Sequence, residues 1–257
     1  MIQLSKRLQT VADYITTGNR VADIGSDHAQ LPVYLIQSGK SAFAVAGEVN
    51  EGPWQAACKQ IENANLTRQI SARKGNGLEV VQPNEVDTVT ICGMGGALIS
   101  TILGQGDQQG KLEGVKELIL QPNIGEDAVR VWLREHDWVL QDEAIVEEEG
   151  KIYEVLYAKK EQRADELNQK LYTGSELGLP YPAPVTNAIL MRMGPYLLQK
   201  KGPVLLKKWE AEMEKLDHII ASLSQSQLDS AKAKLAAVKQ DQTLIKEVLR
   251  WLYTDKP

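Results

Sequence analysis

The sequence predicts an α/β fold in which five parallel strands are closed by an antiparallel hairpin, followed by an all-α region. As far as about residue 160, short apolar runs alternate with amphipathic stretches, which is typical of a parallel sheet covered by helices on both faces. Beyond that point only helical periodicity remains. We therefore expect one domain over residues 1–160 and a second over residues 161–257.

The chain is expected to begin with a helix over residues 4–15, because Leu4, Leu8, Val11 and Ile15 recur at helical spacing. Buried strands are expected at Arg20–Ile24, Ala42–Ala46, Gln69–Arg73, Thr88–Cys92 and Glu117–Leu120. The helices between them are expected near Leu31–Gln37, Pro53–Ala64, Ala97–Leu103 and Glu126–Glu135.

Two further extended stretches, Trp138–Val146 and Ile152–Ala158, are separated by only five residues. Such a connection has no room for a crossover helix, so these strands should form an antiparallel hairpin. The six-stranded dinucleotide-binding sheet is parallel throughout. Five parallel strands with a hairpin instead favour the Rossmann-like sheet of class I methyltransferases.

The C-terminal region begins with residues 161–184, where three spaced prolines predict an irregular connection. Gly194-Pro195 should interrupt the helix that follows. Two segments then carry apolar residues at steps of three and four, Trp209 to Leu223 and Leu228 to Leu252, which predicts a coiled-coil seam on each. The short polar segment Ser224–Gln227 should fold them back as an intramolecular arm. Dimerisation through these seams is the alternative, and we expect a monomer.

The composition excludes several classes of protein. With 257 residues, 43% hydrophobic and 25% charged, the chain is an ordinary globular protein. No run approaches the ~18 apolar residues of a membrane span, and no signal-peptide core follows Met1, so we expect a cytoplasmic protein. Cys58, Cys92 and three histidines show no metal-ligand spacing, so neither a disulfide framework nor a metal site is expected.

The charge is divided unevenly along the chain, whose net charge is −5. Residues 1–160 hold 15 basic and 22 acidic residues, whereas residues 161–257 hold 14 basic and 12 acidic ones. A cationic surface that neutralises phosphates is therefore expected in the C-terminal region, although a charge run is commonly just a solvated face. The candidate residues are Arg192, Lys200, Lys201, Lys207 and Lys208.

A ligand crevice is expected where the first strand ends in Gly25, because open α/β sheets bind ligands at the carboxyl ends of their strands. The dinucleotide fingerprint G-x-G-x-x-G is absent, since Asp27 and Gln30 occupy its second and third glycine positions. A pyrophosphate would meet the Asp27 carboxylate there. A sulfonium cofactor with an amino-acid tail is compatible with that charge.

The following strand ends supply further candidates for an adenosyl cofactor. Glu48 is placed to accept hydrogen bonds from both ribose hydroxyls, and Asn76 to pair with the adenine amino group. The glycines of Gly93–Gly96 permit close approach of the backbone to a ligand. The expected cofactor-binding residues are Asp23, Gly25, Asp27, Glu48, Val49, Asn76, Gly77, Gly93, Met94 and Gly95.

Several segments together resemble the bacterial tRNA adenine-N1 methyltransferase family, over nearly the whole chain. They are Ala22–Ala29, Ala46–Glu48, Gly77–Val80, Cys92–Gly96, Leu118–Asn123 and Lys151–Val155. The resemblance implies that S-adenosylmethionine is the cofactor and that tRNA, methylated on N1 of adenine 22, is the partner. It also implies a Rossmann-like catalytic domain followed by a helical coiled-coil domain.

Methylation of adenine N1 needs alignment more than a base, because N1 of neutral adenine already carries a lone pair. The product is cationic, so Asp27 is expected to stabilise the developing charge; a helix N-cap is the alternative for this residue. His28 would orient its neighbour or simply occupy a turn. Asn123 would offer an amide to the base or form a turn, and Arg7 would reach the cofactor carboxylate or a phosphate unless it lies on a solvated helix face.

Two other functions are compatible with the sequence. The crevice would serve an adenosylmethionine-dependent methyltransferase that acts on another RNA, a protein or a small molecule. A noncatalytic RNA-binding protein that keeps the crevice as a relic is the second alternative, and the intact Asp23, Gly25 and Glu48 speak against it.

Overall fold

The structure is a computed structural model that describes residues 2–225 and 228–253. The chain folds as two units, Met1–Tyr172 and Thr173–Pro257. The first unit therefore extends beyond residue 160, where the sequence places the domain boundary.

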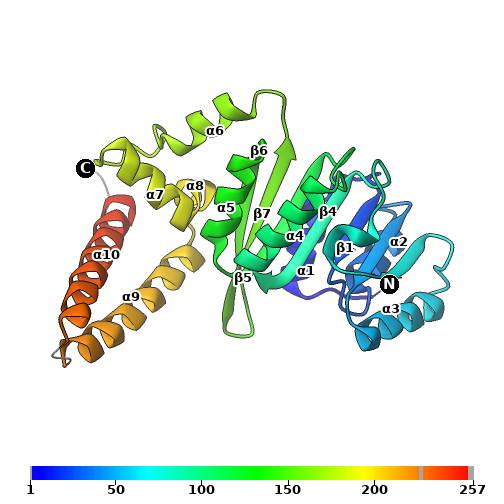
Figure 1. The fold of residues 1–257 in the computed structure, drawn as a ribbon, viewed down its shortest axis with the longest axis horizontal. Coiled ribbons are helices and arrows are strands. Elements are labelled where there is room, and N and C mark those ends of the chain that lie inside the picture. Colours follow the sequence, from blue (N-terminus) through cyan, green and yellow to red (C-terminus); the bar gives the residue numbers. More distant parts are fainter. Residues whose placement is uncertain (1, 226–227, 254–257) are drawn as a thin grey trace. The chain divides into compact units, whose positions relative to one another are not determined.

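A seven-stranded sheet with the order β3-β2-β1-β4-β5-β7-β6 forms the centre of the first unit (Figure 1). Its strands are β1 (Val21–Ile24), β2 (Ala44–Glu48), β3 (Ile70–Lys74), β4 (Thr88–Gly95), β5 (Glu117–Ile124), β6 (Trp138–Glu148) and β7 (Lys151–Lys160). The first five are parallel, and β7 pairs antiparallel with both β5 and β6. The predicted five parallel strands and hairpin are confirmed. The strand order reverses between β1 and β4, which is where such sheets bind ligands.

The helices form two groups of neighbours against this sheet. One group is α1 (Lys6–Tyr14), α2 (Gln30–Gln37) and α3 (Glu51–Asn63), and the other is α4 (Gly96–Gln108), α5 (Glu126–Glu135) and α6 (Ala164–Tyr172), with the 3-10 turn η1 (Gly77–Val80) beside α4. The predicted leading helix buries Val11, Ala12 and Ile15 in a cluster that includes Ile119 of β5 and Val155 of β7. Helix α1 is thus part of the core of the first unit.

The prediction of an irregular connection over residues 161–184 is wrong for Ala164–Tyr172, which form helix α6. This helix buries Ala164, Asn168 and Tyr172, which recur every four residues. Asn168 Nδ2 donates to the main-chain carbonyl of Trp138 at 3.1 Å. Since one member of the buried face is a polar amide and Leu167 is exposed, apolar periodicity alone does not reveal this helix.

The second unit consists of α7 (Ala183–Met193), α8 (Pro195–Lys200), α9 (Pro203–Ser224) and α10 (Asp229–Tyr253). Gly194, with φ of 84°, separates α7 from α8 as predicted. Helices α9 and α10 pair antiparallel: the Tyr253 hydroxyl donates to the Gly202 carbonyl at 3.1 Å, and Gln242 Nε2 donates to Asp217 Oδ1 at 2.8 Å. The predicted turn at Ser224–Gln227 includes residues 226–227, which lie outside the described residues.

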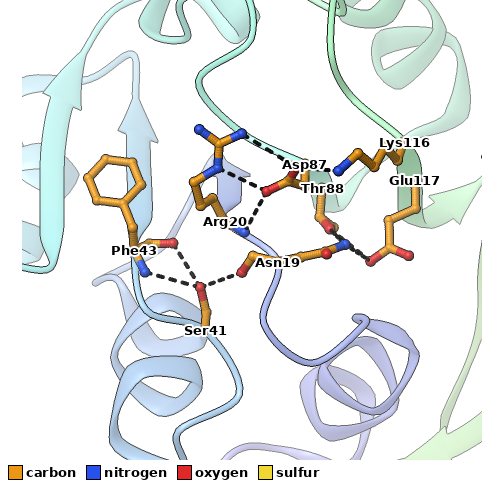
Figure 2. Close-up of polar contacts among 8 residues, drawn as sticks. All are labelled: Asn19, Arg20, Ser41, Phe43, Asp87, Thr88, Lys116 and Glu117. Carbon is orange, nitrogen blue, oxygen red and sulfur yellow. Dashed lines mark hydrogen bonds and ion pairs between the residues drawn. The ribbon is translucent and has the colours of Figure 1, made fainter.

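At the amino ends of the parallel strands, the buried Glu117 carboxylate gathers donors from several segments (Figure 2). It accepts from the Thr88 hydroxyl at 2.7 Å and from Asn19 Nδ2 at 3.0 Å. The backbone amide and hydroxyl of Thr16 donate to it at 2.9 and 2.8 Å, and the Tyr157 hydroxyl at 3.2 Å. This single acid joins the segment before β1 to β4, β5 and β7.

Asp87, beside it, is saturated in the same way (Figure 2). It accepts from the backbone amide and Nε of Arg20 at 3.1 and 2.9 Å, and from Lys116 Nζ at 2.8 Å. The hydrogen bonds from Arg20 and Lys116 hold the pKa of Asp87 well below its usual range.

No helix in the described part of the chain combines the length and apolar character that crossing a bilayer requires.

Candidate active site

A cavity of about 550 Å³ opens at the carboxyl ends of the parallel strands, at the opposite end of the sheet from Glu117 and Asp87. Its size suits a nucleoside-sized ligand. Of the predicted cofactor-binding residues, those that line it are Asp23, Gly25, Asp27, Glu48, Val49, Asn76, Gly77, Gly93 and Met94. Arg7 and Asn123 line it as well, whereas His28 and Gly95 are not among its lining residues. The structure therefore brings together most of the residues that the strand ends predicted.

The end of β1 is fixed by the buried Asp23. Its two oxygens accept from the hydroxyls of Ser26 and Thr90, each at 2.6 Å. Burial raises the pKa of Asp23, while these two hydrogen bonds act in the opposite direction. Gly25 follows with φ of 73°, and a Cβ there would lie 2.3 Å from Met94 Cε. The positive φ favours glycine at this position, and a larger residue would also have to displace the flexible end of Met94.

The turn after Gly25 is strained. Asp27, His28 and Ala29 have φ of 33°, 61° and 53°, and the left-handed region costs a non-glycine residue roughly 1–2 kcal/mol. Ala29 occupies the N-cap position of α2, and no side chain caps that helix end. The helix-cap interpretation of Asp27 is therefore wrong. Its carboxylate is 83% exposed and lies 3.5 Å from His28 Nε2.

Glu48, at the end of β2, is only 7% exposed. Its Oε1 accepts the backbone amide of Asp27 at 2.8 Å, which ties β2 to the strained turn. Among the described residues, no hydrogen bond reaches its Oε2. Because the side chain lines the cavity, this carboxylate keeps acceptor capacity for a ligand.

The opposite wall is built around Gln121, which is fully buried. Its Oε1 accepts from Arg7 Nη1 at 2.5 Å and from the Gly93 amide at 3.0 Å. Its Nε2 donates to Asn123 Oδ1 at 3.2 Å, and Asn123 Nδ2 donates to the Gly93 carbonyl at 2.8 Å. Arg7 also lies over the Tyr153 ring, 5.5 Å from its centroid. Arg7 thus belongs to the cavity wall and not to a solvated helix face.

The sequence did not single out Leu98 and Ile102 of α4 or Tyr153 of β7, which also line the cavity. Three large apolar side chains around the site are strongly exposed: Val49 by 54%, Leu98 by 52% and Ile124 by 73%. The first helical turns after Gly96 were a signal for Leu98 and Ile102, because the helix after a glycine-rich strand end faces the crevice. Tyr153 comes from the hairpin and lies in the segment Lys151–Val155 that carries the family resemblance, but no periodic pattern assigns it to the cavity.

The basic residues predicted for phosphate contact lie in the second unit. Arg192 pairs with Asp241 and lies over the Trp209 ring, 5.5 Å from its centroid. Lys208 lies 5.9 Å from the centroid of the same ring. Lys200, Lys201 and Lys207 are exposed. Arg192 is therefore part of the packing between α7, α9 and α10.

A family profile described as tRNA (adenine(22)-N(1))-methyltransferase matches residues 21–247 of the chain. The chain belongs to this family. The tRNA (adenine(22)-N(1))-methyltransferase of Bacillus subtilis (strain 168) is 43% identical over 249 residues, which cover 96% of this chain and 98% of the relative.

Solved structures agree with this membership. The crystal structure of the B. subtilis m1A22 tRNA methyltransferase TrmK is similar with a TM-score of 0.84 at 42% identity, covering 97% of this chain and all (100%) of that one. A putative tRNA (m1A22) methyltransferase of Streptococcus pneumoniae, in complex with S-adenosyl-L-methionine, has a TM-score of 0.79 at 36% identity, covering 96% and 100%.

Membership in the tRNA (adenine(22)-N(1))-methyltransferase family confirms the enzyme class, the cofactor and the tRNA substrate that the sequence predicted. The fold class is confirmed as that of the class I methyltransferases. Within the described ranges, no three His, Cys, Asp or Glu side chains are grouped so that they could hold a metal ion.

Proposed function

We propose that the cavity of the first unit is where this chain transfers a methyl group from S-adenosylmethionine to N1 of adenine 22 in tRNA. The observation that carries the proposal is Glu48, a nearly buried acid with an open oxygen facing a cavity at the switch point of the sheet. A carboxylate at the end of the second strand suits the two ribose hydroxyls of an adenosyl cofactor.

The remaining cofactor contacts follow from position along the strand ends. Val49, Asn76 and Gly77 lie beyond β2 and β3 and would hold the adenine ring. Asp23, Gly25 and Asp27 would border the amino-acid tail. The backbone of Gly93, Met94 and Gly95 would approach the cofactor from β4. Gly25 and Gly93 both line the cavity without a side chain, which leaves their main chain accessible to a bound ligand.

Bound S-adenosylmethionine supplies a methyl group that its sulfonium has already activated. The chain has to hold N1 of the target adenine in line with it and exclude water. Asp27 would stabilise the positive charge of the methylated ring, with His28 orienting the turn, and Asn123 would accept from the amino group of the base. No general base is needed, because N1 already carries a lone pair.

The target base must leave the tRNA stack, because N1 lies on the Watson–Crick edge. The exposed Leu98 and Ile124 would pack against the faces of the extruded base and its neighbours. Burial of this apolar surface would offset part of the free energy of unstacking.

The second unit would bind the tRNA backbone. The paired α9 and α10 would act as a coiled-coil arm, with the domain boundary after Tyr172. The basic residues of the second unit would neutralise phosphates; they are Arg192, Lys200, Lys201, Lys207 and Lys208. We expect the enzyme to act as a monomer.

Incubation of unmodified tRNA with the protein and S-adenosylmethionine, followed by mass spectrometry of the digested tRNA, tests the activity. We expect one methyl group, on adenine 22, and none on a transcript that carries guanine at that position. Methylation of both transcripts, or of neither, would contradict the proposed target.

A shortened chain that ends at Tyr172 tests the second unit, because the first unit has its own core. It should bind S-adenosylmethionine like the full chain but lose tRNA affinity. Calorimetry measures the first property, and a binding titration at one fixed salt concentration the second. Equal tRNA binding by both chains would refute the assignment of the arm.

A further inference from the structure

A continuous chain of hydrogen bonds links helix α1 to the mouth of the cavity. Arg7 Nη1 donates to Gln121 Oε1, Gln121 Nε2 donates to Asn123 Oδ1, and Asn123 Nδ2 donates to the Gly93 carbonyl, at 2.5, 3.2 and 2.8 Å. Gln121 is fully buried, whereas Asn123 is exposed. This series of hydrogen bonds therefore runs from the Arg7 cation in the cavity wall to the Asn123 amide, which a substrate can reach.

The direction of every bond in this chain is determined. Gln121 Oε1 faces two groups that can only donate, the Arg7 guanidinium and the Gly93 amide. Its Nε2 must then point to acceptors, which are the Pro122 carbonyl at 2.8 Å and Asn123 Oδ1. Asn123 can satisfy both Gln121 and the Gly93 carbonyl in one orientation only. Reversal of either amide would place acceptor against acceptor.

We propose that Arg7 and Gln121 are positioning residues that fix the amide of Asn123 so that its oxygen accepts from the exocyclic amino group of the target adenine. Oδ1 of Asn123 has a second lone pair for that bond, and N1 of the base lies next to the amino group. The charge of Arg7 polarises the Gln121 amide, which makes Gln121 Nε2 a better donor and so holds Asn123 more firmly in this orientation. This inference rests on the proposed function, and it gives Arg7 a role other than phosphate binding.

The amino group of adenine becomes more acidic as the ring gains positive charge, so its hydrogen bond to Asn123 strengthens in the transition state. Loss of the correct amide orientation should therefore lower kcat more than it raises KM for tRNA. A phosphate contact by Arg7 would behave differently, because it would stabilise the complex before any chemistry occurs.

Gln121→Glu is the sharpest variant, since it keeps the shape of the side chain and the acceptor for Arg7 and Gly93 but cannot donate to Asn123. We expect kcat to fall about tenfold, as for one lost hydrogen bond, while the S-adenosylmethionine Kd and the tRNA KM stay within about twofold. Asn168→Asp is the matched control, because it changes another buried amide that lies outside the cavity lining. It should lower the melting temperature and leave kcat unchanged. Equal effects of the two variants on kcat would overturn the proposal.

Arg7→Lys and Arg7→Met provide a second, independent measurement that does not place an acid in the core. Lysine can still donate to Gln121 and should keep most of the rate, whereas Arg7→Met should lower kcat severalfold with no change in the salt dependence of tRNA binding. A rise in tRNA KM, with a salt slope reduced by about one, would show a phosphate contact and overturn the proposal. Failure of the wild-type enzyme to methylate tRNA would instead count against the proposed function.

Discussion

The two ends of the same parallel sheet use carboxylates in opposite ways. At the amino ends of the strands, Glu117 and Asp87 accept from backbone, hydroxyl, amide and cationic donors (Figure 2). At the carboxyl ends, Glu48 accepts from one backbone amide and lines the cavity, and Asp27 is largely exposed. The first pair is used for folding, and the second remains available to ligands.

The backbone differs between the two ends as well. Single left-handed residues precede β3 and β4 at the amino ends, at Asn65 and Asn84, whereas three consecutive non-glycine residues, 27–29, are left-handed beside the cavity. Such strain persists only where the surroundings hold it in place, and it concentrates at functional sites. The difference teaches that the open acceptors and the run of strained residues are kept at the end of the sheet where the cavity lies.

The largest effect is expected from Glu117→Ala. It would leave the donors of Thr16, Asn19 and Thr88 without their acceptor in a buried site, and should lower the free energy of unfolding by about 3–4 kcal/mol. Urea denaturation measures this loss. The folded fraction should still bind S-adenosylmethionine with unchanged affinity, and a weaker cofactor Kd would break the separation between the two ends.

Glu48→Ala is expected to show the reverse pattern. Loss of charge-assisted hydrogen bonds to the ribose should weaken S-adenosylmethionine binding by ~1.5–3 kcal/mol, with little change in unfolding free energy. Calorimetric titration measures the cofactor affinity of the variant, and denaturation of the same variant measures its free energy of unfolding. An unchanged Kd would remove Glu48 from the site.

The sequence predicts features that depend on neighbouring residues better than it predicts contacts between residues far apart in the chain. The strands and their order along the chain follow from apolar runs, and the residues near Gly25, Glu48 and Gly93 were found because parallel strands bring their carboxyl ends together. The partnership of Arg7 with Gln121 joins residues 114 apart in sequence, and no periodic pattern encodes it. Helix α6 was missed because a buried polar amide, Asn168, replaces part of its apolar stripe.

Asp27→Asn should have a smaller effect that is confined to the chemical step. If the Asp27 carboxylate stabilises the cationic ring, removal of its charge lowers the single-turnover methylation rate by about tenfold, ~1.4 kcal/mol, and leaves tRNA KM nearly unchanged. Melting should also be unaffected, because Asp27 does not cap α2. A wild-type rate would shift the acceptor role to Asn123 or to the Gly93 backbone.

Acid titration should separate the ends by the sign of their pKa shifts. The depressed pKa of Asp87 contributes stability that is present above the unfolded pKa of about 3.9 and is lost as the pH falls toward the folded value. The raised pKa of Asp23 has the opposite sign, so its ionisation opposes folding as the pH rises above about 4. Unfolding free energy measured from pH 5 to pH 2 should fall less steeply in Asp87→Asn than in the wild type. Equal slopes would contradict the role of the Arg20 and Lys116 contacts.

The smallest expected effect concerns the strained turn itself, and His28→Gly probes it. The His28 side chain is 59% exposed, so little packing is lost, and relief of the left-handed backbone should exceed the entropy cost of glycine by ~0.5–1 kcal/mol. We expect a slightly higher melting temperature together with slower methylation, because a looser turn holds Asp27 less firmly. Glu149→Gly, at the left-handed turn between β6 and β7, is the matched control: it should raise stability by a similar amount and leave the rate unchanged. If His28→Gly stabilises the protein with full activity, the strain in this turn is not used by the reaction, and the contrast between the two ends is one of open acceptors alone.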